Sequence, residues 1–586
     1  MCGIVGYVGK RGAQQILFSS LAKLEYRGYD SSGIAVRGSG IKVNKDCVRV
    51  NELKERSCAW DGSIGIGHTR WATHGRPSTP NSHPHLDCTG RTAVVHNGVI
   101  SNYQQLKEKL IVEGHVFLSE TDTEVIPHLI EKYYRGNLEE AVGLASGELE
   151  GSYAIAVITE DEAKIVVARK DSPLVIGLGD GENFIASDVP ALLDFTNRVI
   201  FLENGDLGVI QGNNLNIYNQ GSTVDRECKT IHWTRQDIQK SGYDHFMLKE
   251  IYEQPRIVSE SLAKNDASDS LPDISSAGGL LIVACGSSFY AGCVGGQILE
   301  ELLDIPVMVV LASEFNYRLH YPVPEKVVFI CQSGETADVL LAMRRVKMLG
   351  SRCIAITNVP NSSASRLADE VVYMDAGPEI SVAATKTFIA QLMVMYRLAL
   401  HYRINSSRDG LLQEIHLLPA NMQYILDNQE QIVECADYLT RHEDAFFIGR
   451  GLNYPVAQEG ALKLKEISYI HAEACAAGEL KHGTLALLEN ETPIIAVTAP
   501  DRTCTAMLTS IKEVKARAAH VIGLGITRSL ELCRESDELI IVPETHPLLS
   551  PVLNTVALQL LAYHTARLKN LPIDFPRNLA KSVTVE

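Results

Sequence analysis

The 586-residue sequence is poor in positive charge and has neither long apolar runs nor closely spaced cysteine pairs. Its net charge of −17 argues against nucleic acid as a partner, because a phosphate backbone is bound by a basic surface. No apolar run approaches the roughly 20 residues that cross a bilayer, so we expect no membrane partner. The first residues also lack the basic-then-apolar pattern of a secretory signal, and we expect a cytoplasmic protein.

The thirteen cysteines are scattered along the chain and never spaced CxxC. This pattern is typical of reduced thiols and not of a disulfide framework or a zinc knuckle. The stretch NSHPHLD places His83 and His85 on one face of a strand, but Pro84 intervenes and no fourth ligand is near. No GxxxxGK[ST] phosphate loop occurs either. We therefore expect no metal and no cofactor.

The chain is long enough for two to four domains, and its pattern changes once along the way. Residues 2 to about 215 show short β-branched runs with helical stretches at 102–112 and 122–135, which predicts an α+β domain. From about residue 277, buried strands alternate with helices, and this alternation occurs twice. It predicts two tandem α/β lobes, each a doubly wound parallel sheet, derived from a duplication.

The expected boundaries follow from these changes of pattern. A polar stretch without strong periodicity suggests a linker, and the segment HFMLKEIYEQPRIVSESL after it suggests an amphipathic helix. The expected segments are the first domain over 2–220, the linker over 221–245, the lobes over 246–415 and 416–575, and a tail over 576–586.

The opening MCGIVGYVGK places a cysteine directly behind the initiator methionine. Loss of that methionine would leave Cys2 with a free α-amine, whose pKa near ~8 suits it to accept the proton of its own thiol. Position alone does not separate this catalytic interpretation from a small apolar residue at the head of a strand.

Three further motifs in the first domain could complete a site for a nucleophile that attacks an amide. Such chemistry needs donors for an oxyanion, a cation for a substrate carboxylate and an anion for a substrate ammonium. Asn97 and the Gly98 N–H fit the first need, Arg70 the second and Asp122 the third. Each alone could equally be a turn residue, a surface arginine or a helix cap.

Together the motifs CGIVGYVG, EYRGYDSSG, HTRWATHG, HNGVISNY and SETDTE resemble the class II glutamine amidotransferase domain. The resemblance implies an N-terminal-nucleophile hydrolase fold, an αββα sandwich in which Cys2 forms a γ-glutamyl thioester and releases ammonia. It also implies a set of residues that bind or surround glutamine: Arg27, Arg70, Trp71, Thr73, His74 and Asp122.

Two loops in the second half favour an anion. ACGSSFYAG and CQSGETADV each follow a strand and open a helix, where backbone N–H groups and the helix dipole attract negative charge. Such loops also occur as helix caps without a ligand, but two at equivalent strand ends favour a small phosphorylated molecule.

The stretch AQEGALKLKEISYIHAEACAAGELKHGTLA carries candidate proton-transfer groups. Glu459, Lys463 and Glu466 are spaced i, i+4 and i+7, so they share one helix face. Such a face is usually solvated surface, but the Ala- and Gly-rich flanks continue to His482. A carboxylate, a lysine and a histidine suffice to open a sugar ring and move a proton between adjacent carbons.

LKLKEISYIHAEA, GELKHG and PRNLAKSVTVE resemble the family of glutamine-dependent isomerizing sugar-phosphate aminotransferases, which join an amidotransferase domain to two sugar isomerase (SIS) domains. The resemblance implies that glutamine and fructose 6-phosphate become glutamate and glucosamine 6-phosphate, without metal or cofactor and in a homodimer. It implies that His482 opens the ring, Lys581 forms a Schiff base, and Glu466 transfers the proton with support from Lys463. The residues implied at the sugar phosphate are Cys285, Gly286, Ser287, Ser288, Cys331, Gln332, Ser333, Thr336, Val382 and Ala384.

The sequence departs from the family pattern at several positions. Cys331 and Ala384 each replace a serine expected beside the sugar, Thr484 replaces a proline and Cys475 a tyrosine. The lost hydroxyl at 384 removes a hydrogen bond of order ~1 kcal/mol. Two alternatives therefore stay open: an enzyme for a related ketose phosphate or modified sugar, and a non-catalytic sugar-phosphate sensor.

Overall fold

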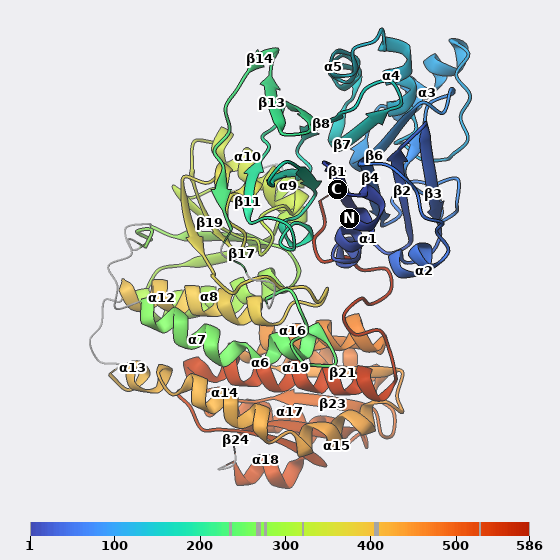
Figure 1. Cartoon of the computed structure of the whole chain (residues 1–586). Coiled ribbons are helices and arrows are strands. Elements are labelled where there is room, and N and C mark those ends of the chain that lie inside the picture. Colours follow the sequence, from blue (N-terminus) through green and yellow to red (C-terminus); the bar gives the residue numbers. More distant parts are fainter. Residues whose placement is uncertain are drawn as a thin grey trace. The chain divides into compact units, whose positions relative to one another are not determined.

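The computed structural model describes residues 2–231, 233, 237–264, 271–274, 278–318, 322–402, 409–526 and 529–584. A few residues of the expected linker (232 and 234–236) and tail (585 and 586) therefore lie outside the described residues. The chain forms two compact units, Met1–Ile238 with Ala580–Glu586, and Gln239–Leu579. Figure 1 shows the elements of both.

The first unit contains two antiparallel sheets. In the described part of the chain, one sheet has the order β15 (Lys229–Thr230), β11 (Arg198–Phe201), β9 (Val175–Leu178), β10 (Asn183–Ala186), β1 (Gly3–Val8), β4 (Ile64–Arg70), β2 (Ser31–Arg37), β3 (Ile41–Asp46). The other has the order β14 (Ser222–Thr223), β13 (Asn214–Asn219), β12 (Asp206–Gln211), β8 (Ile165–Lys170), β7 (Gly151–Thr159), β6 (Thr92–Ile100), β5 (His85–Leu86). The strands β14 and β15 fall in the stretch expected to be a linker.

The alternation of side chains on these strands builds a four-layer sandwich. On β6, Ala93 and Val95 pack against Ile4 and Ile66 of the other sheet, whereas Val94 faces the helices. Helix α1 (Ala13–Ala22) covers the outer face of the first sheet, and the helices α3 (Tyr103–Val112), α4 (Val125–Tyr133) and α5 (Leu138–Glu148) cover the second. The short helix α2 (Val50–Glu55) lies beside β2 and β3. This αββα arrangement confirms the fold predicted for the first domain.

The second unit contains two parallel sheets with the same strand order. Within the described residues, one sheet has the order β17 (Val307–Leu311), β16 (Leu280–Ala284), β18 (Lys326–Ile330), β19 (Arg352–Thr357), β20 (Glu370–Tyr373). The other has the order β22 (His471–Ala476), β21 (Asp444–Gly449), β23 (Pro493–Val497), β24 (His520–Ile526), β25 (Glu538–Val542). Both follow the order 2-1-3-4-5 along the chain, as two copies of one lobe would. The predicted pair of doubly wound parallel lobes is confirmed.

Helices surround these two sheets. Those between residues 246 and 415 are α6 (Phe246–Tyr252), α7 (Gln254–Ala263), α8 (Gly286–Leu303), α9 (Ala312–Tyr317), α10 (Ala337–Met348), α11 (Ser363–Leu367), α12 (Lys386–His401) and α13 (Asp409–Ile415). Those of the second lobe are α14 (Leu418–Asp427), α15 (Glu430–Leu439), α16 (Asn453–Ser468), α17 (Cys504–Lys515), α18 (Leu530–Glu535) and α19 (Ser550–Leu568). The lobes share one apolar core, in which α8 and α12 of the first lobe pack with α16 and α19 of the second.

The single helix expected over HFMLKEIYEQPRIVSESL is two helices, α6 and α7, which meet at Glu253 and Gln254. Pro255 stands in the first turn of α7. Proline is tolerated there because its missing N–H would have no partner within the helix, but it interrupts a continuous helix.

The strand order predicts where each lobe binds a ligand. After β16 the chain crosses to β17 on one side and then to β18 on the other, so the loops after β16 and β18 diverge. A crevice at the carboxyl ends of such strands is the usual ligand site of an open parallel sheet. These two loops carry the motifs ACGSSFYAG and CQSGETADV.

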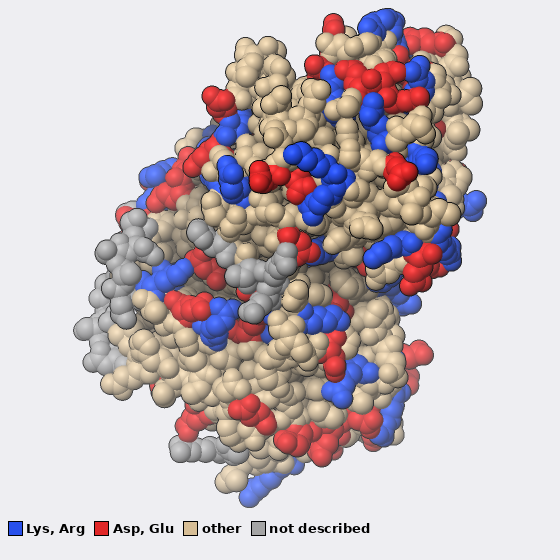
Figure 2. Space-filling view, viewed as in Figure 1, with Lys and Arg blue, Asp and Glu red and all other residues tan. Residues whose placement is uncertain are grey.

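Two features of the surface concern membranes and nucleic acid. None of the helices formed by the described residues is long and apolar enough to cross a bilayer. On the face seen in Figure 2, acidic and basic side chains are interspersed. This mixing is unlike the continuous basic stripe that follows a phosphate backbone.

Candidate functional site

Cys2 directly precedes β1, next to the point where this strand begins its pairing with β4. Its Sγ accepts a hydrogen bond from the Trp71 N–H at 3.3 Å. The neighbouring Gly3 leaves no room for a side chain, because a Cβ there would lie 2.5 Å from the Thr69 hydroxyl oxygen. The glycine after Cys2 thus lets the strand that carries the thiol pack closely against β4.

Asn97 on β6 contacts the nucleophile from the second sheet. Its amide Nδ2 donates to the Cys2 carbonyl oxygen at 2.8 Å. The ring of His68 lies behind it, with Nε2 2.9 Å from the His96 carbonyl oxygen and 3.1 Å from Asn97 Oδ1. Both partners are acceptors, so Nε2 carries the proton. His68 therefore holds the amide of Asn97 with its nitrogen toward Cys2.

Gly98 follows Asn97 with φ of +125°. A Cβ at this position would come within 2.0 Å of the Ser152 carbonyl oxygen on the paired strand β7. The backbone at Asn97 and Gly98 therefore takes a conformation that requires glycine.

Arg70 and Asp122 complete the charged surroundings of the thiol. Arg70 is buried and donates from Nη2 to the carbonyl oxygens of His74 and Gly75. Its Nη1 is buried without a hydrogen-bond partner among the described residues, so one donor remains to bind a substrate carboxylate. Asp122 is also buried and accepts from the Ile100 N–H at 2.8 Å.

The electrostatics show that Cys2, Arg70 and Asp122 act on one another. Burial raises the pKa of the Cys2 thiol, and the positive chain terminus, the Trp71 N–H and the Arg70 guanidinium act against this increase. Burial lowers the pKa of Arg70, and Cys2 and Asp122 oppose that decrease. The net result is a thiol whose pKa lies above its usual value.

The other residues predicted to surround glutamine differ in their surroundings. Arg27 is buried and pairs with Asp188 at 2.5 Å, so its charge is already matched by a carboxylate of the protein. The ring of His74 packs edge-on against Tyr103, and Thr73 is exposed.

His83 and His85 belong to the packing of this unit. The His83 ring stacks on His68 with centroids 4.0 Å apart and meets the His85 ring edge-on at 4.7 Å. His85 Nε2 lies 3.1 Å from the Thr121 hydroxyl. Burial lowers the pKa of both rings well below the usual histidine value, so both are neutral.

In the second unit, the loop after β16 carries Cys285, Gly286, Ser287 and Ser288 into the start of α8. Ser287 Oγ donates to Glu459 at 3.0 Å and accepts from Lys463 at 3.1 Å. These bonds join the first anion loop to α16 of the other lobe.

The loop after β18 carries Cys331, Gln332, Ser333 and Thr336 into α10. Cys331 is buried, and its thiol donates to Thr336 Oγ1 at 3.3 Å. Ser333 Oγ accepts from the Glu335 N–H at 3.2 Å. The thiol therefore occupies a polar loop and is surrounded by hydroxyl groups, where a small anion would find donors.

Glu459, Lys463 and Glu466 form a charged row on α16. The Lys463 ammonium is 1% exposed and lies 2.6 Å from Glu466 and 3.5 Å from Glu459. Burial raises the pKa of Glu459 to about 7, although Lys463 opposes this increase. Burial alone would lower the pKa of Lys463, but the two carboxylates outweigh it and raise the pKa. Glu459 and Lys463 are thus buried and Glu466 is half-buried, so the row is not a solvated helix face.

The remaining predicted sugar-site residues lie in several segments. Val382 is buried and its N–H donates to the Asp574 carbonyl oxygen at 3.0 Å, while Ala384 is half-buried just before α12. His482 ends a short 3-10 helix and is exposed. Lys581 belongs to the first unit, where its N–H bonds to the Tyr26 carbonyl oxygen at 3.4 Å.

The sequence motifs did not identify His68 as a neighbour of Asn97, Ser152 as a neighbour of Gly98, or the bonds from Ser287 to α16. His68 lies in the motif GHTRWATHG, four residues before Ala72. Nothing in this spacing indicates which residue the His68 side chain contacts. Its inward direction follows from the register of β4, in which His68 lies opposite Ile4 and Gly33.

Both units of the chain resemble known protein domains. The sequence pattern of the SIS domain matches residues 273–401 and 438–569, and that of a glutamine amidotransferase domain matches residues 68–194. The C-terminal domain of glucosamine-fructose-6-phosphate aminotransferase from Francisella tularensis is 36% identical, with a TM-score of 0.54, over 57% of this chain and 99% of that one.

Two relatives match this chain along its whole length. The glutamine–fructose-6-phosphate aminotransferase (isomerizing) of Caldanaerobacter subterraneus subsp. tengcongensis is 47% identical over 609 residues, and that of Methanosarcina acetivorans is 46% identical over 620. In both comparisons the match covers 100% of each chain. Such identity does not favour the alternatives of another sugar substrate or a sensor. The chain belongs to the family of isomerizing glutamine–fructose-6-phosphate aminotransferases.

Proposed function

We propose that this enzyme converts glutamine and fructose 6-phosphate into glutamate and glucosamine 6-phosphate. The observation that carries this function is the joint presence of two sites on one chain. One surrounds Cys2 with Asn97, Arg70 and Asp122, and the other joins an anion loop to the charged row of α16.

The first half-reaction takes place at Cys2. After removal of the methionine, the free α-amine takes the thiol proton, and the sulfur attacks the side-chain amide carbon of glutamine. Asn97 Nδ2 and the Gly98 N–H stabilise the oxyanion. The C–N bond breaks, ammonia leaves with the proton, and water then hydrolyses the γ-glutamyl thioester to glutamate.

Binding of glutamine follows from the charges around the thiol. The α-carboxylate pairs with the free Nη1 of Arg70, and the α-ammonium pairs with Asp122. Arg27, Trp71, Thr73 and His74 shape and cover the pocket.

The second half-reaction transfers the released ammonia to the sugar phosphate. The loops at 285–288 and 331–336, with Val382 and Ala384, hold the sugar phosphate. His482 opens the ring, and Lys581 forms a Schiff base at C2 that ammonia displaces. Glu466 then moves a proton from C1 to C2, and Lys463 stabilises its carboxylate.

We also propose a homodimer in which one subunit completes the sugar site of the other. His482 is exposed on its own chain and makes no hydrogen bond to Glu466 within the described residues. A histidine so placed is available to a second copy of the chain.

Product identification tests the proposed function. The purified enzyme is incubated with glutamine and a panel of ketose phosphates, and the products are identified by mass spectrometry. We expect a hexosamine phosphate from fructose 6-phosphate, and none from Cys2→Ala with glutamine as the nitrogen source. Amination of another ketose phosphate in place of fructose 6-phosphate would overturn the substrate, and full activity of Cys2→Ala would overturn the mechanism.

A further inference from the structure

A cluster of metal-ligand side chains lies in the first unit, apart from the nucleophile. Cys88 lies in the turn between β5 and β6, and His115 lies just after α3. His128 and Glu131 follow one another at i and i+3 on α4. One ligand atom from each of the four residues lies within 4.8 Å of every other. Three segments of chain thus bring four ligands to one point.

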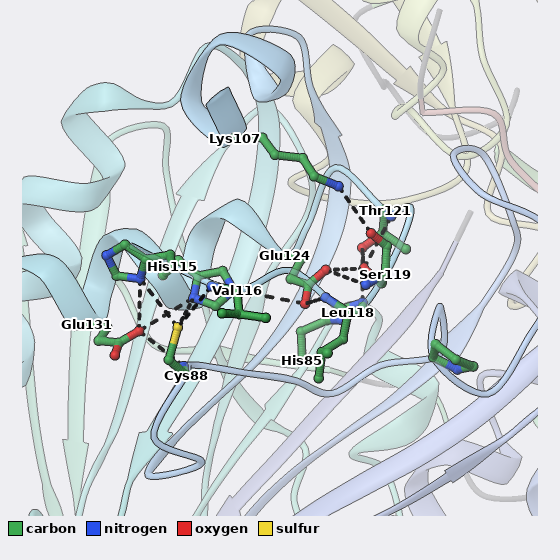
Figure 3. Close-up of polar contacts among 12 residues, drawn as sticks. His85, Cys88, Lys107, His115, Val116, Leu118, Ser119, Thr121, Glu124 and Glu131 are labelled. Carbon is green, nitrogen blue, oxygen red and sulfur yellow. Dashed lines mark hydrogen bonds and ion pairs between the residues drawn. The ribbon is translucent and has the colours of Figure 1, made fainter. Parts of the chain in front are cut away.

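The distances between the ligand atoms suit a tetrahedral ion. Cys88 Sγ lies 3.6 Å from Nδ1 of His115 and 3.4 Å from Nδ1 of His128. The carboxylate oxygen of Glu131 lies 3.1 Å from the first nitrogen and 3.5 Å from the second. Zinc bonds of about 2.0 to 2.3 Å in a tetrahedron separate the ligand atoms by roughly 3.3 to 3.6 Å. Figure 3 shows Cys88, His115 and Glu131 turned toward one another.

The groups around the cluster are those that support metal ligands. The Val116 N–H donates to Cys88 Sγ at 3.4 Å, which stabilises a thiolate. His128 is 1% exposed, and its outer nitrogen Nε2 has no hydrogen-bond partner in the described structure. That nitrogen lies 3.9 Å from the Glu124 carboxylate, which itself accepts from Ser119 and Leu118. A histidine that binds a metal commonly points its second nitrogen at a carboxylate in this way.

We propose that Cys88, His115, His128 and Glu131 bind one zinc ion. Thiolate and imidazole ligands select zinc and softer metals over magnesium or calcium, which prefer oxygen. All four tetrahedral positions are taken by protein groups, so the ion is structural and leaves no position for a substrate.

The zinc ion would stabilise the segment that positions Asp122. Residues 115–124 join α3 to α4, and the cluster fixes this segment at His115 and, through His128, next to Glu124. Asp122 lies between these two points. The site is distinct from His83 and His85, which pack on His68 and Thr121.

Metal analysis of the full-length protein tests the proposal. The purified protein is stripped with a chelator, given zinc and desalted, and its metal content is measured by mass spectrometry. The variants are Cys88→Ser and His128→Gln, with the exposed Cys58→Ser and His471→Gln as matched controls. We expect about one zinc per chain in the wild type and both controls, and less than about 0.1 in both variants.

Two further measurements do not depend on the folding of a variant. Cobalt added to the stripped wild-type protein should give the absorption of a tetrahedral site with a sulfur-to-metal charge-transfer band. Zinc should raise the melting temperature of the wild type and of Cys58→Ser. The proposal fails if the wild type retains no zinc after desalting, if cobalt gives no sulfur band, or if folded Cys88→Ser retains a full equivalent.

Discussion

The protonated Nε2 of His68 lies 3.1 Å from the amide oxygen of Asn97 and so determines which end of that amide faces Cys2. Burial lowers the pKa of His68 to about 3, so the ring is neutral at any pH at which the enzyme would work. A neutral ring has one donor nitrogen, and both acceptors beside Nε2 require that this nitrogen be the donor.

We therefore expect His68→Leu to lower kcat for glutamine hydrolysis by about 10- to 100-fold with a smaller change in KM, because a misplaced amide weakens oxyanion stabilisation. Steady-state glutaminase kinetics measure the effect. His68→Gln keeps an N–H donor and should recover part of the rate. Equal rates for the wild type and His68→Leu would contradict the positioning role.

Gly98→Ala should impair folding as well as catalysis. The new Cβ would lie 2.0 Å from the Ser152 carbonyl oxygen at a φ of +125°, so strand β6 must shift, at a cost of about 1–3 kcal/mol for the backbone strain alone. Thermal unfolding measures the loss. Gly114 has a φ of +100° with open space around it, so Gly114→Ala is the matched control and should cost less. Equal losses would show that the contact with Ser152 is unimportant.

Glu459 should make stability depend on pH. Its folded pKa of about 7 exceeds the ordinary value of 4.5, so the folded state binds the proton more tightly than the unfolded state. The free energy of unfolding is then highest below about pH 4.5 and falls as the pH rises to about 7, by at most about 3 kcal/mol. Glu459→Gln cannot ionise and should flatten this decline in denaturant titrations between about pH 5 and pH 8. The exposed Glu443→Gln should leave the decline unchanged, and an unaltered decline in Glu459→Gln would refute the assignment.

Ala384→Ser should tighten the sugar pocket. A hydroxyl at this half-buried position adds a hydrogen bond of about 1 kcal/mol, which corresponds to about a fivefold lower KM for fructose 6-phosphate with kcat little changed. KM for glutamine serves as the internal control and should not move. A higher KM for the sugar would indicate that residue 384 does not face the ligand.

Lys581 should form a covalent adduct with the sugar. Borohydride reduces a Schiff base to a stable amine, so treatment with fructose 6-phosphate should label a peptide from the tail, as detected by mass spectrometry. Lys581→Arg should lose the label, whereas Lys569→Arg should retain it. Labelling of another lysine, with the tail unmodified, would reassign the Schiff base.

Much of the architecture could be predicted from local patterns. Short β-branched runs predicted the sheets of the first unit, and the repeated strand-helix alternation predicted both lobes. The helix over HFMLKEIYEQPRIVSESL was predicted as one because its apolar period continues through Pro255, whereas the ring interrupts the helix hydrogen bonds. Strand β22 lies within the stretch that carries the candidate proton-transfer groups, and the sequence predicts no strand there, since this edge strand is half-exposed and lacks a buried apolar run.

The candidate site was predictable to the extent that motifs carry chemistry. Cys2, Asn97 and Asp122 were chosen by residue type and spacing, and the structure brings Cys2 and Asn97 into contact. The cluster at Cys88 was not predicted. The spacing of the nearby His83 and His85 resembles a metal site, but the sequence predicts no metal there. The side chains that meet Cys88 are 27 and more residues away from it.

The sequence by itself determined the two kinds of domain and the residue types proposed for both sites, because these depend on composition, periodicity and short motifs. Only the tertiary structure decided which residues meet. Ser287 contacts Glu459 across 172 positions of sequence, and His68 reaches Asn97 from another sheet. Such contacts depend on how β-sheets and helices pack and on strand register, and no local pattern encodes the position of a side chain relative to a distant segment.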